Sequence, residues 1–187
     1  MTAMNSPSQT ASPSDAILVV GAGGHGRVVA ELARGCGFSG IAFADDRAPD
    51  AVGTLADLPS LVPRHAAVAV SIGNLPFRQR LFDELEALSV HLPPLVHPTA
   101  FVSPSAQIGS GSLVLPGAIV NANAVIGKGT IISAGAIIDH DATVGPCSHV
   151  DAGAVVAARA SVPHLTKVPA GSCVRPDSPI ANEGGGK

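Results

Sequence analysis

The sequence predicts an α/β domain followed by a β-helix built from six-residue repeats. From Val96 to Val174, every sixth residue is Ile or Val without exception. Residues 16–95 lack this period and show short apolar runs that alternate with helical patterns around a glycine-rich turn. In an α-helix, six residues advance by about 240° and would scatter the aliphatic side chains. In a strand an even period keeps them on one face, so the second domain is predicted to be all β.

The α/β domain is predicted from three apolar runs and two helical patterns. We expect strands at 16–20, 41–44 and 67–73. We expect helices at 27–37, where an amphipathic pattern ends at glycine, and at 76–89, where a proline stands near the start. This β-α-β-β-α order is typical of a mostly parallel sheet and amounts to about half of a dinucleotide-binding fold.

Two further features of the hexad series support the β-helix. Ala, Ser or Thr stands four residues after each of the first thirteen aliphatic residues, and glycine recurs between them. Glycine accepts the positive φ that tight corners require. Short strands, tight corners and a stacked interior are typical of hexapeptide β-helices. If three hexads make one coil, residues 18 apart stack on one another.

The composition divides the chain into four segments. We expect a disordered tail at 1–15, the α/β domain at 16–95, the β-helix at 96–176 and a flexible tail at 177–187. No long linker separates the two domains, so they are expected to pack as one rigid body.

Charge and composition exclude several classes of protein. A net charge of −3 leaves no basic surface for nucleic acid. Three scattered cysteines suit a reducing cytoplasm better than a disulfide framework. The N-terminus lacks the pattern of a secretory signal, and no apolar run is long enough to insert into a membrane.

A glycine-rich loop joins the first predicted strand to the first predicted helix. Gly21, Gly23 and Gly26 satisfy G-x-G-x-x-G, a pattern that lets backbone amides approach a phosphate at a helix N-terminus. Asp45 and Asp46 end the second strand, where a carboxylate can take a ribose hydroxyl. The loop therefore predicts a nucleotide or nucleotide-sugar site. The alternative is a glycine turn used only for tight packing.

His140 is the strongest catalytic candidate, because two carboxylates, Asp139 and Asp141, flank it. Either one could fix the ring tautomer and raise its basicity, as a general base near neutral pH requires. In an 18-residue coil His140 stacks between Ala122 and Ala158, and these small neighbours leave a notch for a substrate. The alternative is a polar histidine on a solvated surface.

Two other histidines are weaker candidates. His149 lies nine residues after His140, about half a coil away, and is expected to share a cleft wall with it. Taken alone, His149 is more typical of a solvated coil surface. His25, in the glycine loop, could face the same cleft. No spacing of His, Cys and Asp residues suggests a metal site.

The motifs together resemble a known family. VVGAGGHGRVVAE, FADD, SIGNLPFRQRL, LVHPTAFVSPSAQIGSGS and IIDHDATVGPCSHVDAGAVV stand in this order over residues 16–158. They resemble the bacterial sugar O-/N-acyltransferases of the sialic-acid-biosynthesis type, and most closely the UDP-4-amino-sugar N-acetyltransferases of bacillosamine-type pathways. The resemblance implies a Rossmann-like N-terminal domain, a left-handed parallel β-helix, and a homotrimer with acetyl-CoA at the subunit interfaces.

The resemblance also implies roles for individual residues. His140 is the catalytic base, with Asp141 as its acidic partner. His149 and Ala158 contact acetyl-CoA. The UDP-sugar pocket is implied at Gly21, Gly23, Gly24, His25, Asp45, Asp46, Gly73 and Asn74.

Three departures from the family pattern stand out. Ser133 replaces an asparagine seven residues before the catalytic histidine, and Ala158 replaces a glycine whose amide approaches the acetyl carbonyl. The family pattern also continues for about two more coils. Because the hexad phase is intact, we expect a loss of whole coils rather than a disrupted fold.

The sequence thus predicts a cytoplasmic acetyl-CoA-dependent N-acetyltransferase that acts on a UDP-linked 4-amino-dideoxy sugar in surface-glycan or glycoprotein sugar biosynthesis. His140 would take a proton from the amine as it attacks the thioester, and backbone amides would stabilise the oxyanion. The main alternative is O-acetylation of sialic acid or another sugar. Two others are a nucleotide-sugar-binding protein whose shortened β-helix has lost transfer activity and an NAD-linked oxidoreductase.

Overall fold

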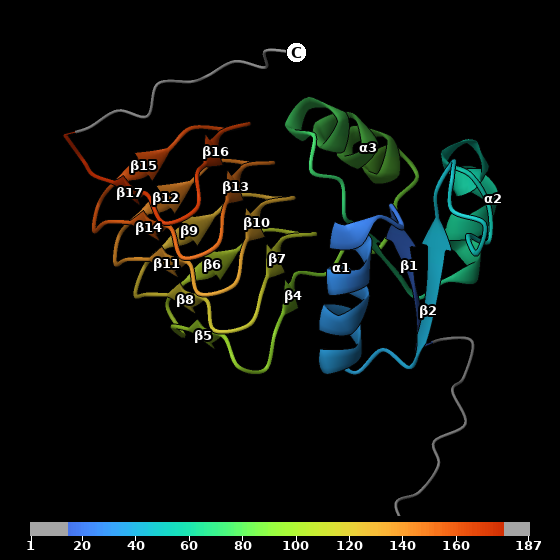
Figure 1. Cartoon of the computed structure of the whole chain (residues 1–187), viewed down its shortest axis with the longest axis horizontal. Helices are drawn as coiled ribbons and strands as arrows, with labels where there is room; N and C mark the ends of the chain where they lie inside the picture. The colour runs from blue at the N-terminus through green and yellow to red at the C-terminus, as the bar shows by residue number, and fades with distance from the viewer. Residues whose placement is uncertain (1–14, 178–187) are drawn as a thin grey trace, which may run out of the picture.

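The computed structural model describes residues 15–177, which form an α/β domain and a β-helix packed side by side (Figure 1). The predicted tails at 1–15 and 177–187 lie outside the described residues, apart from Asp15 and Asp177. Among the residues described, no helix is long and apolar enough to span a bilayer.

A three-stranded parallel sheet forms the centre of the first domain. The central strand β1 (Ala16–Val20) lies between β2 (Gly40–Ala44) and β3 (Ala67–Val70). Helix α1 (Gly24–Gly35) follows β1, and helix α3 (Leu75–Ala87) follows β3. The chain runs from β1 to β2 on one side and returns to β3 on the other side. The carboxyl end of β1 is therefore a topological switch point, where open α/β sheets bind ligands.

Three short helical segments between β2 and β3 were not predicted. They are η2 (Leu55–Asp57), α2 (Leu58–Leu61) and η3 (Val62–Arg64). A capping box begins this run, in which the Asp57 carboxylate accepts the backbone N–H of Thr54 at 2.8 Å. Each segment has only three or four residues, too few to show a helical period.

The second domain is the predicted left-handed parallel β-helix, with strands of two residues each. The strands are β4 (Leu95–Val96), β5 (Phe101–Val102), β6 (Gln107–Ile108), β7 (Leu113–Val114), β8 (Ile119–Val120), β9 (Val125–Ile126), β10 (Ile131–Ile132), β11 (Ile137–Ile138), β12 (Thr143–Val144), β13 (His149–Val150), β14 (Val155–Val156), β15 (Ser161–Val162), β16 (Lys167–Val168) and β17 (Cys173–Val174).

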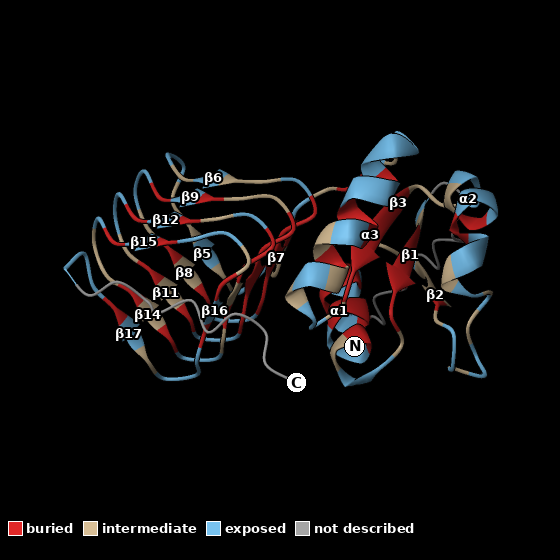
Figure 2. Cartoon of the chain, turned by 90° about the horizontal axis from the view of Figure 1, so that it is seen from above, coloured by how far each residue is buried: buried red, intermediate tan, exposed pale blue. Residues whose placement is uncertain are grey.

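Three parallel sheets form the walls of the β-helix, in the strand orders β16-β13-β10-β7-β4, β17-β14-β11-β8-β5 and β15-β12-β9-β6. Paired residues stand 18 apart, as Ile132 does from Val114 and from Val150. The second residue of each strand joins the interior core together with the small residues of the corners (Figure 2). The hexad core and the coil of three hexads are therefore confirmed.

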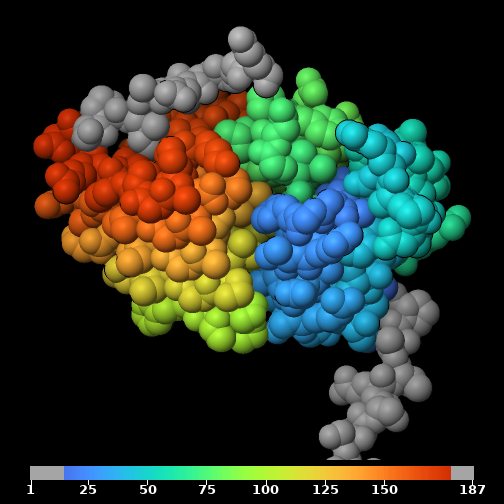
Figure 3. All heavy atoms as spheres, viewed as in Figure 1, coloured from blue at the N-terminus to red at the C-terminus, as the bar shows by residue number. Residues whose placement is uncertain are grey.

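The two domains share a core. The sheet of β4, β7, β10, β13 and β16 faces the α/β domain, and the two domains meet along its length (Figures 1 and 3). Its outward residues Leu113 and Ile131 pack in one buried cluster with Ile17 of β1 and Leu32 of α1. The β-helix begins at Leu95, one residue before the predicted boundary.

Helix α3 docks against the corners of successive coils. The ring of Phe82 lies so close to Gly111 and Gly129 that a Cβ at either glycine would stand 2.5 and 2.8 Å from it, respectively. Both glycines also have positive φ, of 62° and 63°. The recurring glycine of the hexad series is thus required at these corners both by the turn and by the docked helix.

Candidate active site

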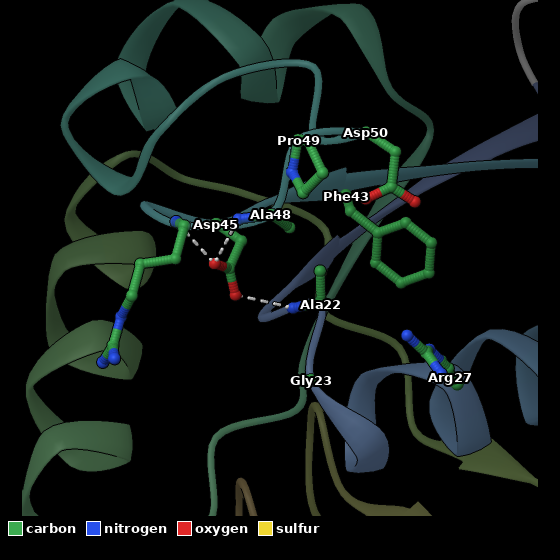
Figure 4. A pocket seen from close by; sticks show the side chains of 9 residues that line it. Ala22, Gly23, Arg27, Phe43, Asp45, Ala48, Pro49 and Asp50 are labelled. Atoms are coloured by element: carbon green, nitrogen blue, oxygen red, sulfur yellow. Dashed lines mark hydrogen bonds between the residues drawn. The ribbon is translucent and has the colours of Figure 1, made fainter.

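A pocket of about 480 Å³ opens beside the carboxyl ends of β1 and β2 (Figure 4). Its lining comes from the glycine loop, the first turn of α1, the end of β2 and the loop that follows. The lining residues are Ala22, Gly23, Arg27, Phe43, Asp45, Arg47, Ala48, Pro49 and Asp50. The pocket therefore lies at the switch point and combines an aromatic ring with charged side chains of both signs.

The four glycines of the loop have two different surroundings: two are closely packed and two border open space. Gly21 has a φ of 99°, and a Cβ on Gly26 would stand 2.2 Å from the Gly21 carbonyl oxygen. These two glycines therefore allow the loop to pack against the helix. A Cβ on Gly23 or on Gly24 would meet nothing within 4 Å. The packing-only alternative thus accounts for Gly21 and Gly26, but Gly23 and Gly24 border open space.

The start of α1 is free to bind an anion. Gly23 is the N-cap residue, and no side chain caps the helix. The first turn contains no acidic residue. Unpaired amides at a helix N-terminus, together with the helix dipole, favour a phosphate group.

The structure gives the two predicted acidic residues different positions. Asp45 lines the pocket and accepts the backbone N–H groups of Ala22 (2.8 Å), Arg47 (2.8 Å) and Ala48 (3.1 Å). These hydrogen bonds, first that of Ala22, lower the pKa of Asp45 and hold the glycine loop against the end of β2. Asp46 instead accepts the backbone N–H of Leu55 at 2.9 Å and is not among the pocket-lining residues. Asp45 is thus the acidic residue at this pocket, and the predicted role of Asp46 in sugar binding stays a prediction.

Gly73 and Asn74 lie in the turn between β3 and α3, outside the pocket lining. Strand β3 ends at Val70, so 71–73 is a turn rather than the predicted end of a strand. Asn74 is the N-cap of α3 and accepts the backbone N–H of Phe77 at 2.9 Å. Both residues are exposed at the same edge of the sheet as the glycine loop.

A second cluster lies at the junction of the two domains. His25, in the first turn of α1, and His149, on β13, stand with their ring centroids 6.2 Å apart. His149 Nε2 lies 2.9 Å from the Ser133 hydroxyl and 3.9 Å from an Asp151 carboxylate oxygen. The structure therefore brings these two predicted histidines together. Ser133, the departure from the family pattern, supplies the polar partner.

Arg78 of α3 is a buried cation that the sequence analysis missed. It is 0% exposed, and its guanidinium donates to the carbonyl oxygens of Ile72 (2.7 Å), Cys147 (2.7 Å) and Ser148 (2.9 Å). Burial lowers the pKa of Arg78 to about 10, so it remains charged at neutral pH. Arg78 thus ties the turn after β3 to the residues before His149.

The histidines of this junction are neutral at physiological pH. Burial, followed by the charge of Arg78, lowers the pKa of His149 to about 4 and lowers the pKa of His25 as well. A neutral imidazole can offer both a donor and an acceptor to a ligand.

This shift predicts a pH dependence of stability. Between about pH 6.5 and 4 the unfolded chain binds a proton at residue 149 that the folded protein does not bind, so the free energy of unfolding falls as the pH falls. A shift of this size corresponds to about 3 kcal/mol. Urea unfolding at pH 7.5 and 4.5 should show a smaller loss for His149→Gln, which lacks the titrating ring, than for the wild type. Equal losses would contradict the assignment.

His140 lies at the corner that follows β11. Its Nδ1 stands 2.8 Å from Asp141 Oδ2, and an ionised carboxylate can only accept, so Nδ1 carries the proton. Asp139 instead accepts the His140 backbone N–H at 2.7 Å. The structure therefore resolves the open choice between the two carboxylates: Asp141 orients the ring, and Asp139 holds the backbone. Nε2 is left as the basic nitrogen.

Within one chain, His140 and His149 do not share a cleft wall. His149 stands on the sheet that faces the α/β domain, whereas His140 stands at the corner between the other two sheets. The expected half-coil separation is correct, but half of a triangular coil leads from one sheet to the opposite corner. Ala158 does lie one coil beyond His140, where the next residue, Arg159, donates its N–H to the His140 carbonyl at 3.0 Å.

No metal site is apparent in the described part of the chain. Within 15–177, no group of three or more His, Cys, Asp or Glu residues could hold a metal ion.

The fold, an α/β domain followed by a β-helix of hexapeptide repeats, is that of a hexapeptide-repeat acyltransferase. Residues 16–85 match the PglD N-terminal domain, and residues 105–140 match the bacterial transferase hexapeptide family. The acetyltransferase domain of PglB from Neisseria gonorrhoeae FA1090, solved with acetyl coenzyme A, is 37% identical, with a TM-score of 0.82 over 85% of this chain and 81% of that one. The chain thus belongs to the bacterial sugar N-acetyltransferases of the PglD type, and it is an acetyltransferase.

Two solved structures of a Caulobacter crescentus enzyme are also similar. PerB in complex with CoA and GDP-perosamine is 31% identical, with a TM-score of 0.75 over 89% of this chain and 91% of that one. A variant of this perosamine N-acetyltransferase with one histidine replaced by asparagine is 27% identical, with a TM-score of 0.73 over 88% and 90%. A search of curated proteins gave no match.

The coverage corrects one expectation from the sequence. Because 89% of this chain aligns with 91% of PerB, the two chains are similar in length. The expectation that the β-helix has lost two whole coils relative to that enzyme is therefore wrong.

Proposed function

We propose that the protein transfers an acetyl group from acetyl-CoA to the amine of a nucleotide-linked 4-amino-dideoxy sugar, with a UDP-linked sugar as the first choice. The main support for this proposal is the His140–Asp141 pair, in which His140 Nδ1 lies 2.8 Å from Asp141 Oδ2. The chain that carries this pair is 37% and 31% identical to two solved acetyltransferases. We further propose a cytoplasmic location, because Cys36, Cys147 and Cys173 are all free thiols, as a reducing compartment favours.

The pocket beside α1 suits the nucleotide. Its volume of about 480 Å³ lies in the range of small-ligand sites. The uncapped helix start at Gly23 and the cations Arg27 and Arg47 favour a diphosphate. Phe43 offers an apolar face to a base or a ribose. The sugar would then extend from the glycine loop toward the junction of His25 and His149.

The proposed chemistry is direct transfer. His140 Nε2 accepts a proton from the sugar amine as its nitrogen attacks the thioester carbonyl carbon, and Asp141 stabilises the imidazolium that forms. Collapse of the tetrahedral intermediate breaks the C–S bond, and the CoA thiolate takes up the proton. An acyl-enzyme is not required. Burial raises the pKa of the Cys147 thiol, which makes it a poor nucleophile.

The proposed site needs a second copy of the chain. His140 stands away from the nucleotide pocket of its own chain, so it would serve the pocket of a neighbour. The sheet that ends at the His140 corner carries apolar outward residues on every strand. These are Phe101, Ile119, Ile137, Val155 and Cys173. We propose that this face forms the interface of a homotrimer, and that acetyl-CoA binds between copies, where it contacts Ala158 beside the His140 corner of one chain and His149 at the domain junction of the next.

Gly23→Val tests the nucleotide site. The Val side chain fits the free protein, since a Cβ at residue 23 meets nothing within 4 Å, but it would fill the space where a phosphate must approach. We expect the KM for the amino sugar to rise at least tenfold, about 1.4 kcal/mol, with the KM for acetyl-CoA nearly unchanged. Steady-state kinetics with each substrate varied in turn would measure both.

Equal effects on the two KM values, or tight NAD binding by the wild type, would contradict this assignment. Gly26→Val is the matched structural control. Its Cβ would collide with the Gly21 carbonyl, so it should lower the melting temperature, which Gly23→Val should not.

The chain is an acetyltransferase, so the alternative of a nucleotide-sugar-binding protein without transfer activity is not retained. Calorimetry tests both substrate sites, because the proposed enzyme binds CoA as well as the nucleotide sugar, and binding of the sugar alone would contradict it. The O-acetyltransferase alternative shares the same base and differs only in the acceptor, so it requires an activity assay.

A further inference from the structure

Two asparagine side chains reach across one coil to the carboxylates beside His140. Asn121 Nδ2 donates to Asp139 Oδ1 at 3.0 Å, and Asn123 Nδ2 donates to Asp141 Oδ1 at 3.1 Å. Each pair is 18 residues apart, so the β-helix stacking itself brings the amides into place.

The corner geometry favours asparagine at residue 123. Asn123 has a φ of 57°, and the residue stacked on it, Asp141, has a φ of 58°. Asn and Asp tolerate this left-handed conformation better than other residues with side chains. The backbone N–H of Asn123 is held in turn by the Ser105 hydroxyl at 3.1 Å, one coil earlier. The amide is therefore carried on a fixed corner.

We propose that Asn123 is a positioning residue for the catalytic base: it fixes the Asp141 carboxylate so that the other oxygen orients the His140 ring. The two oxygens of the Asp141 carboxylate have different partners. Oδ1 accepts a hydrogen bond from the Asn123 side-chain amide, and Oδ2 accepts one from His140 Nδ1 at 2.8 Å. An unanchored carboxylate could rotate away, because both His140 and Asp141 are about half exposed in a single chain, at 51% and 47%.

The neighbouring charges agree with this role. Hydrogen bonds from His140 and then from Asn123 lower the pKa of Asp141, which remains ionised. The other charged groups at this corner are Asp139, on the same coil, and Arg159, one coil beyond, while the preceding coil offers only neutral amides. Asn121 does not have the same role as Asn123, because it binds Asp139. Asp139 accepts the backbone N–H of His140 and does not contact the imidazole ring through a hydrogen bond.

Two substitutions test the role of Asn123. Asn123→Asp keeps the size and the left-handed corner but replaces the donor with a negative charge, which favours the protonated imidazole. We expect the rising limb of the kcat/KM profile to move up by about 0.5–1 pH unit. Asn123→Gly removes the amide without backbone strain, and we expect kcat to fall about three- to tenfold with both KM values unchanged.

Ser105→Asp is the control for a general charge effect, because it adds the same charge one coil farther from His140. It should shift the profile less than Asn123→Asp does. Circular dichroism and melting temperature would confirm that all three variants fold. An unshifted Asn123→Asp profile with full kcat in Asn123→Gly would overturn the inference, and so would equal shifts for the two aspartate variants.

The inference rests on the proposed function, and the two fail differently. If His140→Ala retains activity, the proposed base is wrong. If His140→Ala is inactive while both Asn123 variants behave as the wild type, only the positioning role is wrong.

Discussion

Replacing His140 with alanine is expected to lower kcat by about 10²–10⁴-fold and to leave binding of the nucleotide sugar nearly unchanged. The loss is large because His140 Nε2 is the proposed acceptor of the amine proton, and the hydrogen bond of Nδ1 to Asp141, 2.8 Å long, holds the ring in the required tautomer. Asp141→Asn should cost less, since it weakens the orientation of the ring without removing it. Single-turnover kinetics and calorimetry on the same preparations would separate the two effects.

His164→Ala is the matched control for this experiment. His164 is another exposed histidine of the β-helix, and within residues 15–177 it is not paired with a carboxylate, so its loss should leave kcat within about twofold. Ala158→Leu adds a steric test, because it fills the space one coil beyond His140 and should also lower kcat without unfolding the protein. If His140→Ala keeps more than half of the wild-type kcat, His149 becomes the next candidate base.

Ile138→Asp is expected to abolish soluble expression. Ile138 is 0% exposed in the interior of the β-helix, where an unpaired carboxylate costs several kcal/mol in addition to the lost apolar contacts. That loss is comparable with the whole stability of an ordinary domain, about 5–15 kcal/mol. Ile132→Asp, which changes the same interior position one hexad earlier, should behave in the same way.

The adjacent residue supplies the control. Ile137 points outward on the apolar face proposed as the trimer interface and is only partly buried. Ile137→Asp should therefore fold, retain nucleotide-sugar binding and lose both trimer formation and activity. Light scattering should give the mass of a trimer for the wild type and of a monomer for this variant. Normal yield and stability for Ile138→Asp would contradict the β-helix register, and a monomeric wild type would contradict the shared site.

The β-helix could be predicted from the sequence because its signal is local and repetitive. The aliphatic residue of each hexad recurs at the position that points inward, and one period fixes the stacking of Asp139 and Asp141 on Asn121 and Asn123. The spacing of the residues left the choice between the two carboxylates open, because both flank His140 in sequence, and the family resemblance alone favoured Asp141. Only their side-chain directions show that Asp141 meets the ring.

Other parts of the site depend on contacts between distant segments. Arg78 stands in a helix, where an arginine normally indicates an exposed face, and its burial depends on carbonyl groups of the β-helix that are 69 and 70 residues away. Phe43 and Arg47 become pocket residues only because the loop after β2 folds beside α1. The opposite placement of His140 and His149 follows from the triangular coil, which sequence spacing alone does not convey.

Release of free CoA is the most direct measure of the proposed acetyl transfer to a nucleotide-linked amino sugar. The wild-type protein would be incubated with acetyl-CoA and, in separate reactions, with UDP- and GDP-linked 4-amino-dideoxy sugars, the matching sugars without the amine, and sialic acid. Thiol release and the mass of the product would be followed together. We predict thiol release only with the amino sugars, a product heavier by one acetyl group, and loss of both signals in His140→Ala. Release with sialic acid or with the amine-free sugars, or no release with any acceptor, would contradict the proposed N-acetyltransferase.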